Sequence, residues 1–271
     1  MKIDLHNHTT YSDGVFSPKN LVDIARREKV EVFALTDHDS VFGCEEIQQY
    51  AKQVGQKVIS GMELSTDYKG YSVHIVCLFP KNKVPQGLID FSYQKKEERK
   101  NRAIQMMQNI KDIYHLNMDI EELVKENEVI TRANMGYHLA KYNAMSQKEV
   151  EPYIDQKSKA YIPSTKLSVE DGIQMVKKFG CLTILAHPCL LPRNIVEELM
   201  EFSFDGIEAR YPKNQENDEA YFKDLAQKYN LLISAGSDFH GDQGTKHAMI
   251  GTSYLSEDEF KPILERLAIE W

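Results

Sequence analysis

The chain begins with MKIDLHNHTTYSDG (residues 1–14), in which a short strand-like run ends in His6-Asn7-His8. Side chains alternate along a strand, so the two imidazoles are expected to point the same way and to be able to bind one metal ion. By itself this pair is equally compatible with a structural or solvent-exposed role. The choice between a metal-binding pair and a structural or exposed pair depends on the rest of the sequence.

The same arrangement recurs after other strand-like runs: TDHD (36–39), GME (61–63), AHP (186–188) and SDFH (237–240), with a further histidine inside YSVHIVCLF (71–79). The carboxyl ends of parallel strands converge on one face of a barrel, so these residues are expected to meet. The candidate metal ligands are His6, His8, Asp13, His38, Glu63, His74, His187, Asp238 and His240. His115, His138 and His247 lie in helical or loop-like contexts and are expected to be structural.

Imidazole and carboxylate ligands without cysteine favour Mn²⁺, Fe²⁺ or Zn²⁺ at a catalytic site, with Mg²⁺ also possible. Nine candidates exceed the needs of one ion and predict two or three, with Glu63 as the bridge. Asp37, His187 and His240 are the candidates for catalytic roles. For Asp37 the expected role is to orient a metal ligand, and the alternative is a plain polar residue at a strand end.

Seven runs have the composition of strands, and several are apolar on both faces, as in parallel strands covered by helices. They are Lys2–His8, Val32–His38, Lys57–Ser65, Ser72–Phe79, Leu182–His187, Gly206–Tyr211 and Leu231–Gly236. Helix starts are indicated by Ser17-Pro18 and by two capping-box patterns, Ser168–Asp171 and Ser256–Glu259.

The alternation of strand and helix is interrupted across residues 83–165, which include a helix-like segment at Phe91–Tyr114. We therefore expect an α/β barrel with the metal site, formed by residues 1–82 and 166–271, and a helical insertion at 83–165 that caps the substrate. A length of 271 residues suits one barrel, since such domains commonly have about 250.

The 33 basic and 41 acidic side chains give a formal charge of −8, which offers no overall attraction for nucleic acid or acidic membranes. A stable nucleic-acid complex is not expected, and an anionic substrate has to be attracted locally. Neither a signal peptide nor an apolar run of about 18 residues is present, so a cytoplasmic location is expected. The four cysteines contain no CxxC pair and are expected to be reduced.

The motifs DLHNHTTYSDG, ALTDHDS, GMELS, VHIV, LAHP and GSDFH together resemble the PHP (polymerase and histidinol phosphatase) family of metal-dependent phosphoesterases. Within the insertion, EERKNRAIQMM, VITRANMGYHLA and KAYIPST resemble the branch that includes a 3′,5′-nucleoside bisphosphate phosphatase and a 5′-to-3′ exoribonuclease. The resemblance implies a distorted seven-stranded β/α barrel with metal ligands at the nine positions above. Where relatives usually have a basic residue after LAHP, this sequence has Cys189-Leu190, and Arg193 is expected to compensate.

The expected reaction is hydrolysis of a phosphate ester by a hydroxide that bridges two metal ions. The expected substrates are nucleoside 3′,5′-bisphosphates or the 5′ ends of short RNA. A histidinol-phosphate phosphatase and a non-catalytic PHP-type metal-binding module are the alternatives. The candidates for binding substrate phosphates are Arg99, Arg102, Arg132 and Arg193, and Tyr161 or Tyr211 is the candidate for stacking on a base. The oligomeric state and the proton donor to the leaving group stay open.

Overall fold

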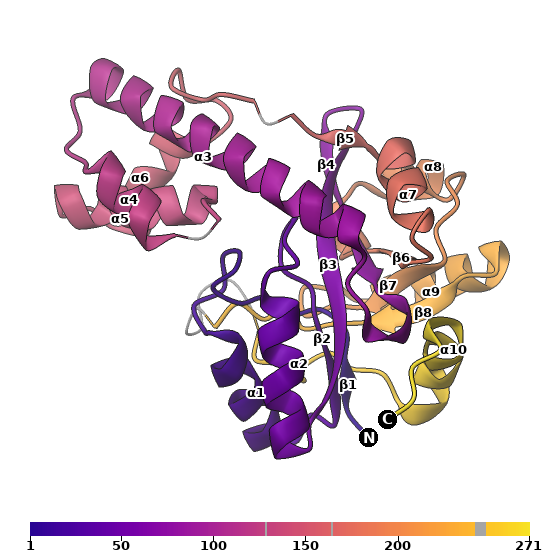
Figure 1. The fold of residues 1–271 in the computed structure, drawn as a ribbon. Coiled ribbons are helices and arrows are strands. Elements are labelled where there is room, and N and C mark those ends of the chain that lie inside the picture. The colour runs from indigo at the N-terminus through magenta and orange to yellow at the C-terminus, as the bar shows by residue number, and fades with distance from the viewer. Residues whose placement is uncertain (128, 164, 242–247) are drawn as a thin grey trace.

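The computed structural model describes residues 1–127, 129–163, 165–241 and 248–271 and contains a nearly closed, barrel-like sheet (Figure 1). The strand order is β1-β2-β3-β4-β6-β7-β8, and the short β5 pairs with β3 off this path. The bounds are β1 Ile3–Asp4, β2 Val32–Leu35, β3 Lys57–Tyr68, β4 Tyr71–Leu78, β5 Leu167–Ser168, β6 Leu182–Leu185, β7 Gly206–Arg210 and β8 Leu232–Ala235.

All pairs along this path are parallel except those of β4, which runs antiparallel to β3 and β6. β3 and β4 form a hairpin, with Lys69 and Gly70 at positive φ in the turn between them. The sheet closes where Leu5 N donates to Ala235 O at 3.0 Å and His8 N donates to Phe239 O at 2.9 Å. The seven strands of this path therefore lie within or overlap the runs that the sequence predicts.

Most of the strands end earlier than the sequence predicts, because the chain leaves the regular ladder at the carboxyl edge. β1 stops at Asp4 rather than His8; beyond it Asn7 N donates to Thr36 Oγ1 at 3.1 Å, and Asn7 pairs with Phe239 only as an isolated parallel bridge. Along β2, Val32 and Ala34 pack with the side chains inside the barrel, whereas Phe33 and Leu35 pack with the outer helices. Both faces of the strand are buried, as expected of a parallel barrel.

The helices that surround the sheet are α1 Pro18–Arg27, α2 Gly43–Val54, α7 Val169–Lys177, α8 Arg193–Leu199, α9 Asp218–Tyr229 and α10 Glu257–Leu267, with short 3-10 turns η1 Pro80–Asn82 and η2 Pro188–Leu190. The three predicted N-caps are present, but only one of the two predicted capping boxes is complete. Ser17 Oγ accepts from Asn20 N, Ser168 Oγ accepts from Asp171 N, and Ser256 and Glu259 form a capping box.

The segment between β4 and β5 is helical, as predicted, and extends to one side of the barrel (Figure 1). It consists of α3 Gln86–Tyr114, α4 Ile120–Glu126, α5 Arg132–Asn143 and α6 Gln147–Ile154. α3 begins five residues before the predicted Phe91, directly after Pro85. Its first turns pack on the outer barrel core through Leu88, and its later turns pack on α4–α6 through Met106 and Met107. The domain division at residues 82/83 and 165/166 stays a prediction.

The remaining histidines take structural positions where they are described. His115 ends α3 in the left-handed conformation, and buried His138 accepts a hydrogen bond from Asp119 N at 3.0 Å. His247 lies outside the described residues. Among the helices of the described ranges, none has the length and apolar character needed to cross a membrane.

Candidate metal centre

Glu63, on β3, is fully buried and lies at the centre of a ring of imidazoles from four other strand ends and loops. Its Oε2 lies 3.3 Å from His6 Nε2, 3.2 Å from His8 Nε2 and 2.9 Å from His38 Nδ1. Its Oε1 lies 2.9 Å from both His74 Nδ1 and His187 Nε2. Each carboxylate oxygen thus faces a different set of nitrogens, which is the arrangement expected of a bridging ligand.

Two aspartates and a sixth histidine complete the cluster on the Oε2 side. Asp238 Oδ1 lies 3.1 Å from His8 Nε2, and Asp13 Oδ1 lies 3.1 Å from His240 Nε2. The ligand atoms form three overlapping groups, each within 4.8 Å: His8 with Asp13, His38 and His240; His6 with His8, Glu63 and Asp238; and His38 with Glu63 and His74. All nine residues predicted from the sequence are brought together.

The donor atoms are better placed to bind divalent metal ions than to form hydrogen bonds with one another. His6 Nε2, His8 Nε2, His38 Nδ1 and Glu63 Oε2 are buried and make no hydrogen bond of acceptable geometry within the described ranges. Buried polar atoms are otherwise nearly always satisfied, because an unmade hydrogen bond costs about 1–3 kcal/mol. Imidazole nitrogens and carboxylate oxygens converging in this way would be satisfied by bound cations.

Burial and mutual charge shift the pKa values in this cluster strongly. Burial alone would raise the pKa of Glu63, but His38, His6 and His74 hold it well below its usual range. Burial likewise opposes protonation of His38 and His240, yet Glu63 and Asp13 raise their pKa values to about 9 and about 10. For His74 burial dominates and lowers the pKa to about 4. Positive charge is therefore strongly favoured between the carboxylates, whether it comes from protons or from metal ions.

Asp37, expected to orient a metal ligand, hydrogen-bonds residues of the loop that follows His8 rather than the side chain of His38. Its Oδ1 accepts from Thr9 N at 2.7 Å and from Ser12 Oγ at 2.6 Å, and its Oδ2 accepts from Thr9 Oγ1 at 2.6 Å. Successive side chains of an extended chain point to opposite sides, so Asp37 faces away from its neighbour. It holds the loop between His8 and Asp13 instead, and Ser12 Oγ lies 3.3 Å from His8 Nδ1.

Glu208, on β7, was not predicted from the sequence, and Tyr211 was predicted only to stack on a base, although both contact metal-ligand candidates. Glu208 Oε1 lies 3.2 Å from His6 Nδ1, and its Oε2 accepts from His187 N at 2.7 Å. Tyr211 donates to Asp238 Oδ2 at 2.9 Å and is 4% exposed, so it is placed to hold a ligand rather than to stack on a base. For Glu208 the only signal in the sequence was the presence of a carboxylate inside the strand-like run GIEAR.

A cavity of about 560 Å³ separates the metal centre from the helical insertion. Asp13, His38 and His74 line it on the barrel side. Its other walls carry the three predicted arginines, Arg99, Arg102 and Arg132, and two lysines that were not predicted, Lys95 and Lys166. Tyr161 also lines the cavity, with its ring centroid 5.3 Å from the Arg102 guanidinium carbon. The insertion thus supplies a positively charged wall opposite the ligands.

The five cations differ in their carboxylate partners, and Lys95 is paired with Glu98 at 2.7 Å. Arg99 forms an ion pair with buried Asp39, which lies beside His38 in the sequence. Arg102 donates to Ile162 O at 2.6 Å, and Lys166 donates to Ser72 Oγ at 2.6 Å. Within the described ranges, Arg102, Arg132 and Lys166 form no ion pair with a carboxylate. Their positive charge is available to a ligand.

Arg193 lies elsewhere, contrary to the expectation that it replaces the missing basic residue after His187-Pro188. It is bound to Asp218 at 3.2 Å and stacks on Tyr221, with 4.5 Å from the guanidinium carbon to the ring centroid. Its place at the start of α8 directs it to α9. It does not line the cavity that contains the metal-ligand candidates.

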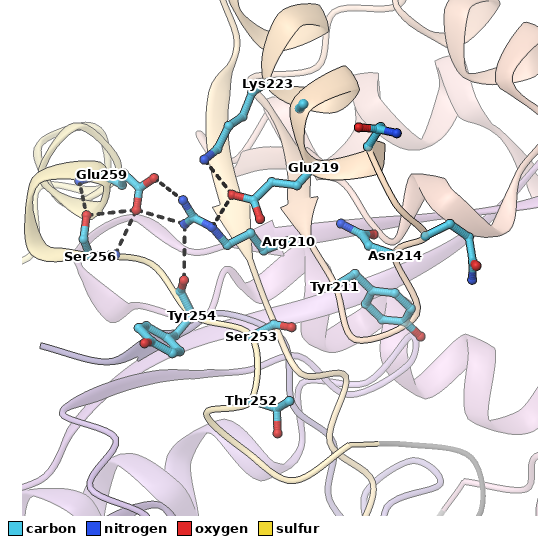
Figure 2. Close-up of a pocket in the computed structure, with 13 residues that line it drawn as sticks. Arg210, Tyr211, Asn214, Glu219, Lys223, Thr252, Ser253, Tyr254, Ser256 and Glu259 are labelled. Atoms are coloured by element: carbon cyan, nitrogen blue, oxygen red, sulfur yellow. Dashed lines mark hydrogen bonds and ion pairs between the residues drawn. The ribbon is translucent and has the colours of Figure 1, made fainter.

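A larger cavity, of about 900 Å³, lies outside the end of β7 (Figure 2). Its arginine is neutralised: Arg210 Nε lies 2.7 Å from Glu219 Oε1, and Arg210 Nη2 lies 2.5 Å from Glu259 Oε1. Lys223 is also paired with Glu219, at 2.6 Å. The charges of this cavity are satisfied among its own side chains, so it is a weaker candidate for an anion than the smaller one.

Comparison with known proteins gives relatives along most of the chain. A 5′-3′ exoribonuclease from Haemophilus influenzae is 29% identical over 248 residues, covering 88% of this chain and 90% of that protein. A phosphoribosyl 1,2-cyclic phosphate 1,2-diphosphodiesterase from Eggerthella lenta is 27% identical, covering 89% and 95%. A 3′,5′-nucleoside bisphosphate phosphatase from Chromobacterium violaceum is 28% identical, covering 88% and 87%.

The fold is also shared with a solved structure and a family model. A structure from Bifidobacterium adolescentis, described as a metal-dependent phosphoesterase, superposes with a TM-score of 0.85 at 23% identity and covers 97% of this chain and 96% of that one. The model of the PHP domain matches residues 4–167, more than half of the chain and most of the strand ends that carry the cluster. The chain therefore belongs to the PHP domain family and is a metal-dependent phosphoesterase.

Proposed function

We propose that this phosphoesterase hydrolyses nucleotides that carry a second anionic group, either nucleoside 3′,5′-bisphosphates or the 5′ ends of short RNA. The observation that carries this proposal is the charge of the cavity. Metal-ligand candidates line one side, and Arg102, Arg132 and Lys166, without carboxylate partners in the described ranges, line the other. A phosphate placed at the ligands would leave a second one to be bound by these three cations.

The pKa values in the cavity support an anionic ligand there. Burial is the largest influence that lowers the pKa of Arg102, and nearby Arg132 and Arg99 lower it further. Burial and the same two arginines also lower the pKa of Lys166. These cations repel one another, and a phosphate between them would relieve that repulsion. A ligand with an ammonium group, such as histidinol phosphate, would add to it.

We propose that the nine clustered residues bind two or three divalent ions, with Glu63 as the bridge, and that Mn²⁺, Fe²⁺ and Zn²⁺ suit the donors best, with Mg²⁺ also possible. Such ions would supply positive charge to the phosphoryl oxygens and a nucleophile near neutral pH. The protein contributes the geometry: Asp37 fixes the loop of His8 and Asp13, and Tyr211 fixes Asp238. His187 and His240 stay candidates for moving a proton at the reacting phosphate.

Tyr161 is proposed to contact the base. Its ring lines the cavity and is partly exposed, and its contact with Arg102 places a planar surface beside one of the phosphate-binding cations. Stacking on an aromatic ring tolerates any base, which suits an enzyme that acts on successive nucleotides.

The test is a kinetic comparison, with Mn²⁺, of adenosine 3′,5′-bisphosphate, short 5′-phosphorylated RNA, a cyclic nucleotide phosphate and histidinol phosphate. We expect the bisphosphate or the RNA to have the highest kcat/KM. Arg132→Ala should lower that value by about 10- to 100-fold, the loss of one charge-assisted hydrogen bond, and should change hydrolysis of a monophosphate far less. Arg193→Ala, outside the cavity, is the matched control. Histidinol phosphate as the best substrate would refute the proposal.

A further inference from the structure

Glu208 is a buried carboxylate that contacts the metal centre without belonging to any of the groups of clustered donor atoms. It lies on β7, is 1% exposed and has two polar neighbours, one at each oxygen. Oε1 lies 3.2 Å from His6 Nδ1, and Oε2 accepts a hydrogen bond from His187 N at 2.7 Å. Burying a carboxylate is costly unless it is paired, so its position indicates a specific task.

The contact with His6 determines which ring nitrogen carries the proton. His6 Nε2 faces Glu63 Oε2 at 3.3 Å and Asp238 Oδ1 at 3.5 Å, whereas Nδ1 faces Glu208. Only the Nδ1 contact has hydrogen-bond geometry, whereas Nε2 makes no hydrogen bond within the described ranges. Because a carboxylate can only accept, Nδ1 is the nitrogen that donates to Glu208. The lone pair of Nε2 is then directed into the cluster, as a metal ligand requires.

The contact with His187 fixes a backbone conformation that L residues rarely adopt. His187 has φ 30° and ψ 56°, in the left-handed region, and its N–H is held by Glu208. This conformation turns the ring so that Nε2 lies 2.9 Å from Glu63 Oε1. His6 and His187 face different oxygens of Glu63. The Glu208 carboxylate contacts both histidines and therefore supports both sides of the proposed bridge.

The local backbone geometry leaves room for the contact between Glu208 and His6. The pairing of β7 with β8 is irregular between Glu208 and Arg210, as in a β-bulge, which re-aims side chains at a strand end. A methyl group on Gly236 would lie 2.7 Å from Glu208 Oε1 and 2.2 Å from His6 Cβ. On the outer side, Arg210 extends toward Glu219 and Glu259 and anchors the same strand end (Figure 2).

We propose that Glu208 is a positioning residue for the metal centre, which keeps the proton of His6 on Nδ1 and holds the backbone of His187 for metal binding. The inference rests on the proposed ligand set and adds a residue to it that touches neither metal nor substrate. It accounts for a buried charge, a strained backbone and a glycine that meet at one point. Partners of this kind typically alter metal affinity by about 10- to 100-fold.

Glu208→Gln tests the proposal because it changes the number of acceptors and hardly changes the shape. The carboxylate has two accepting oxygens for two donors, whereas the amide has one, so either His6 or His187 loses its partner. Titration of the chelator-stripped protein with Mn²⁺, followed by calorimetry and by the EPR signal of bound Mn²⁺, should show a Kd raised about 10- to 100-fold or one fewer ion bound.

Glu219→Gln is the matched control. It makes the same chemical change on a carboxylate that contacts β7 through Arg210, and it touches no metal-ligand candidate. Its Mn²⁺ affinity should stay within about twofold of that of the natural sequence. Glu208→Asp, which keeps two acceptors on a shorter stem, is the second variant in case the glutamine variant does not fold, and it should also bind more weakly.

The outcomes separate the two proposals. If the natural sequence binds less than one equivalent of metal, the ligand set and the role of Glu208 both fail. If it binds metal but a folded Glu208→Gln or Glu208→Asp binds as tightly, only the role of Glu208 fails. A variant with a lower melting temperature and an unchanged Kd would mark Glu208 as merely structural. Inactivity toward nucleotides with intact metal binding would refute the proposed substrate alone.

Discussion

The ion pair between Arg99 and Asp39 is predicted to stabilise the protein more than it binds substrate. Asp39 is 4% exposed and follows His38, while Arg99 lies on α3 of the insertion. In Arg99→Met, which keeps much of the aliphatic stem, Asp39 retains the hydrogen bond from Ser65 N at 2.8 Å but loses its counter-charge. The variant leaves a buried carboxylate unpaired and removes a link between the insertion and the barrel.

Removing one partner of a buried ion pair costs about 3–5 kcal/mol. Arg99 is 21% exposed and both residues line the cavity, so water replaces part of the lost interaction, and about 2–3 kcal/mol is expected. For a domain of this size, each kcal/mol shifts the melting temperature by about 2–4 °C, which gives a fall of roughly 4–12 °C. Asp39→Asn/Arg99→Met should recover part of the loss, because asparagine carries no charge and tolerates the positive φ of residue 39.

The measurement is thermal unfolding at one fixed metal concentration, since bound metal itself adds stability. Burial would raise the pKa of Asp39, but Arg99 holds it below its usual range. The contribution of the pair is therefore complete above the unfolded pKa, about 4, and is lost as the pH falls through the lower folded value. The difference between the natural sequence and Arg99→Met should thus be constant from pH 6 to 8 and shrink in acid. Equal melting temperatures at pH 7 would refute the reasoning.

Three further predictions concern the metal centre. In Gly236→Ala, the new methyl group would lie 2.2 Å from His6 Cβ, so elemental analysis should find less bound metal, and full occupancy would contradict the contact. Asp37→Ala leaves one amide and two hydroxyls without their acceptor, so denaturant unfolding should show a loss of about 3–5 kcal/mol, and a loss below about 1 kcal/mol would argue against its role. With pKa values of about 9 and 10, His38 and His240 are protonated at pH 7 in stripped protein. Metal binding should therefore release protons and tighten as the pH rises, as calorimetry in buffers of different ionisation enthalpy can measure.

The ligand set could be predicted because its residue types are distinctive and its members follow strand-like runs. His8, Glu63 and Asp238 are far apart in the sequence, and the convergence of strand ends in a barrel brought them together as expected. Supporting residues gave no comparable signal. Glu208 acts through the side chain of His6 and the backbone of His187, and neither contact leaves a pattern in the sequence.

Sequence neighbours were a poor guide to partners around the site. Asp37 is adjacent to His38 but faces Thr9 and Ser12, because side chains alternate along the extended chain. The charge available on an arginine likewise depends on contacts across the fold. Arg99 and Arg132 look alike in the sequence, yet only Arg99 meets a buried carboxylate among the described residues.

The closure of the sheet between its first and last strands has a consequence for biosynthesis. His8 N bonds to Phe239 O, so residues synthesised at the two ends of the chain must meet before His8 and Asp238 can face each other. Such long-range pairing forms slowly and late in folding. A nascent chain that still lacks β8 and the residues after it does not contain the full set of candidate ligands, so this set can assemble only after His240 has been synthesised and the barrel has closed.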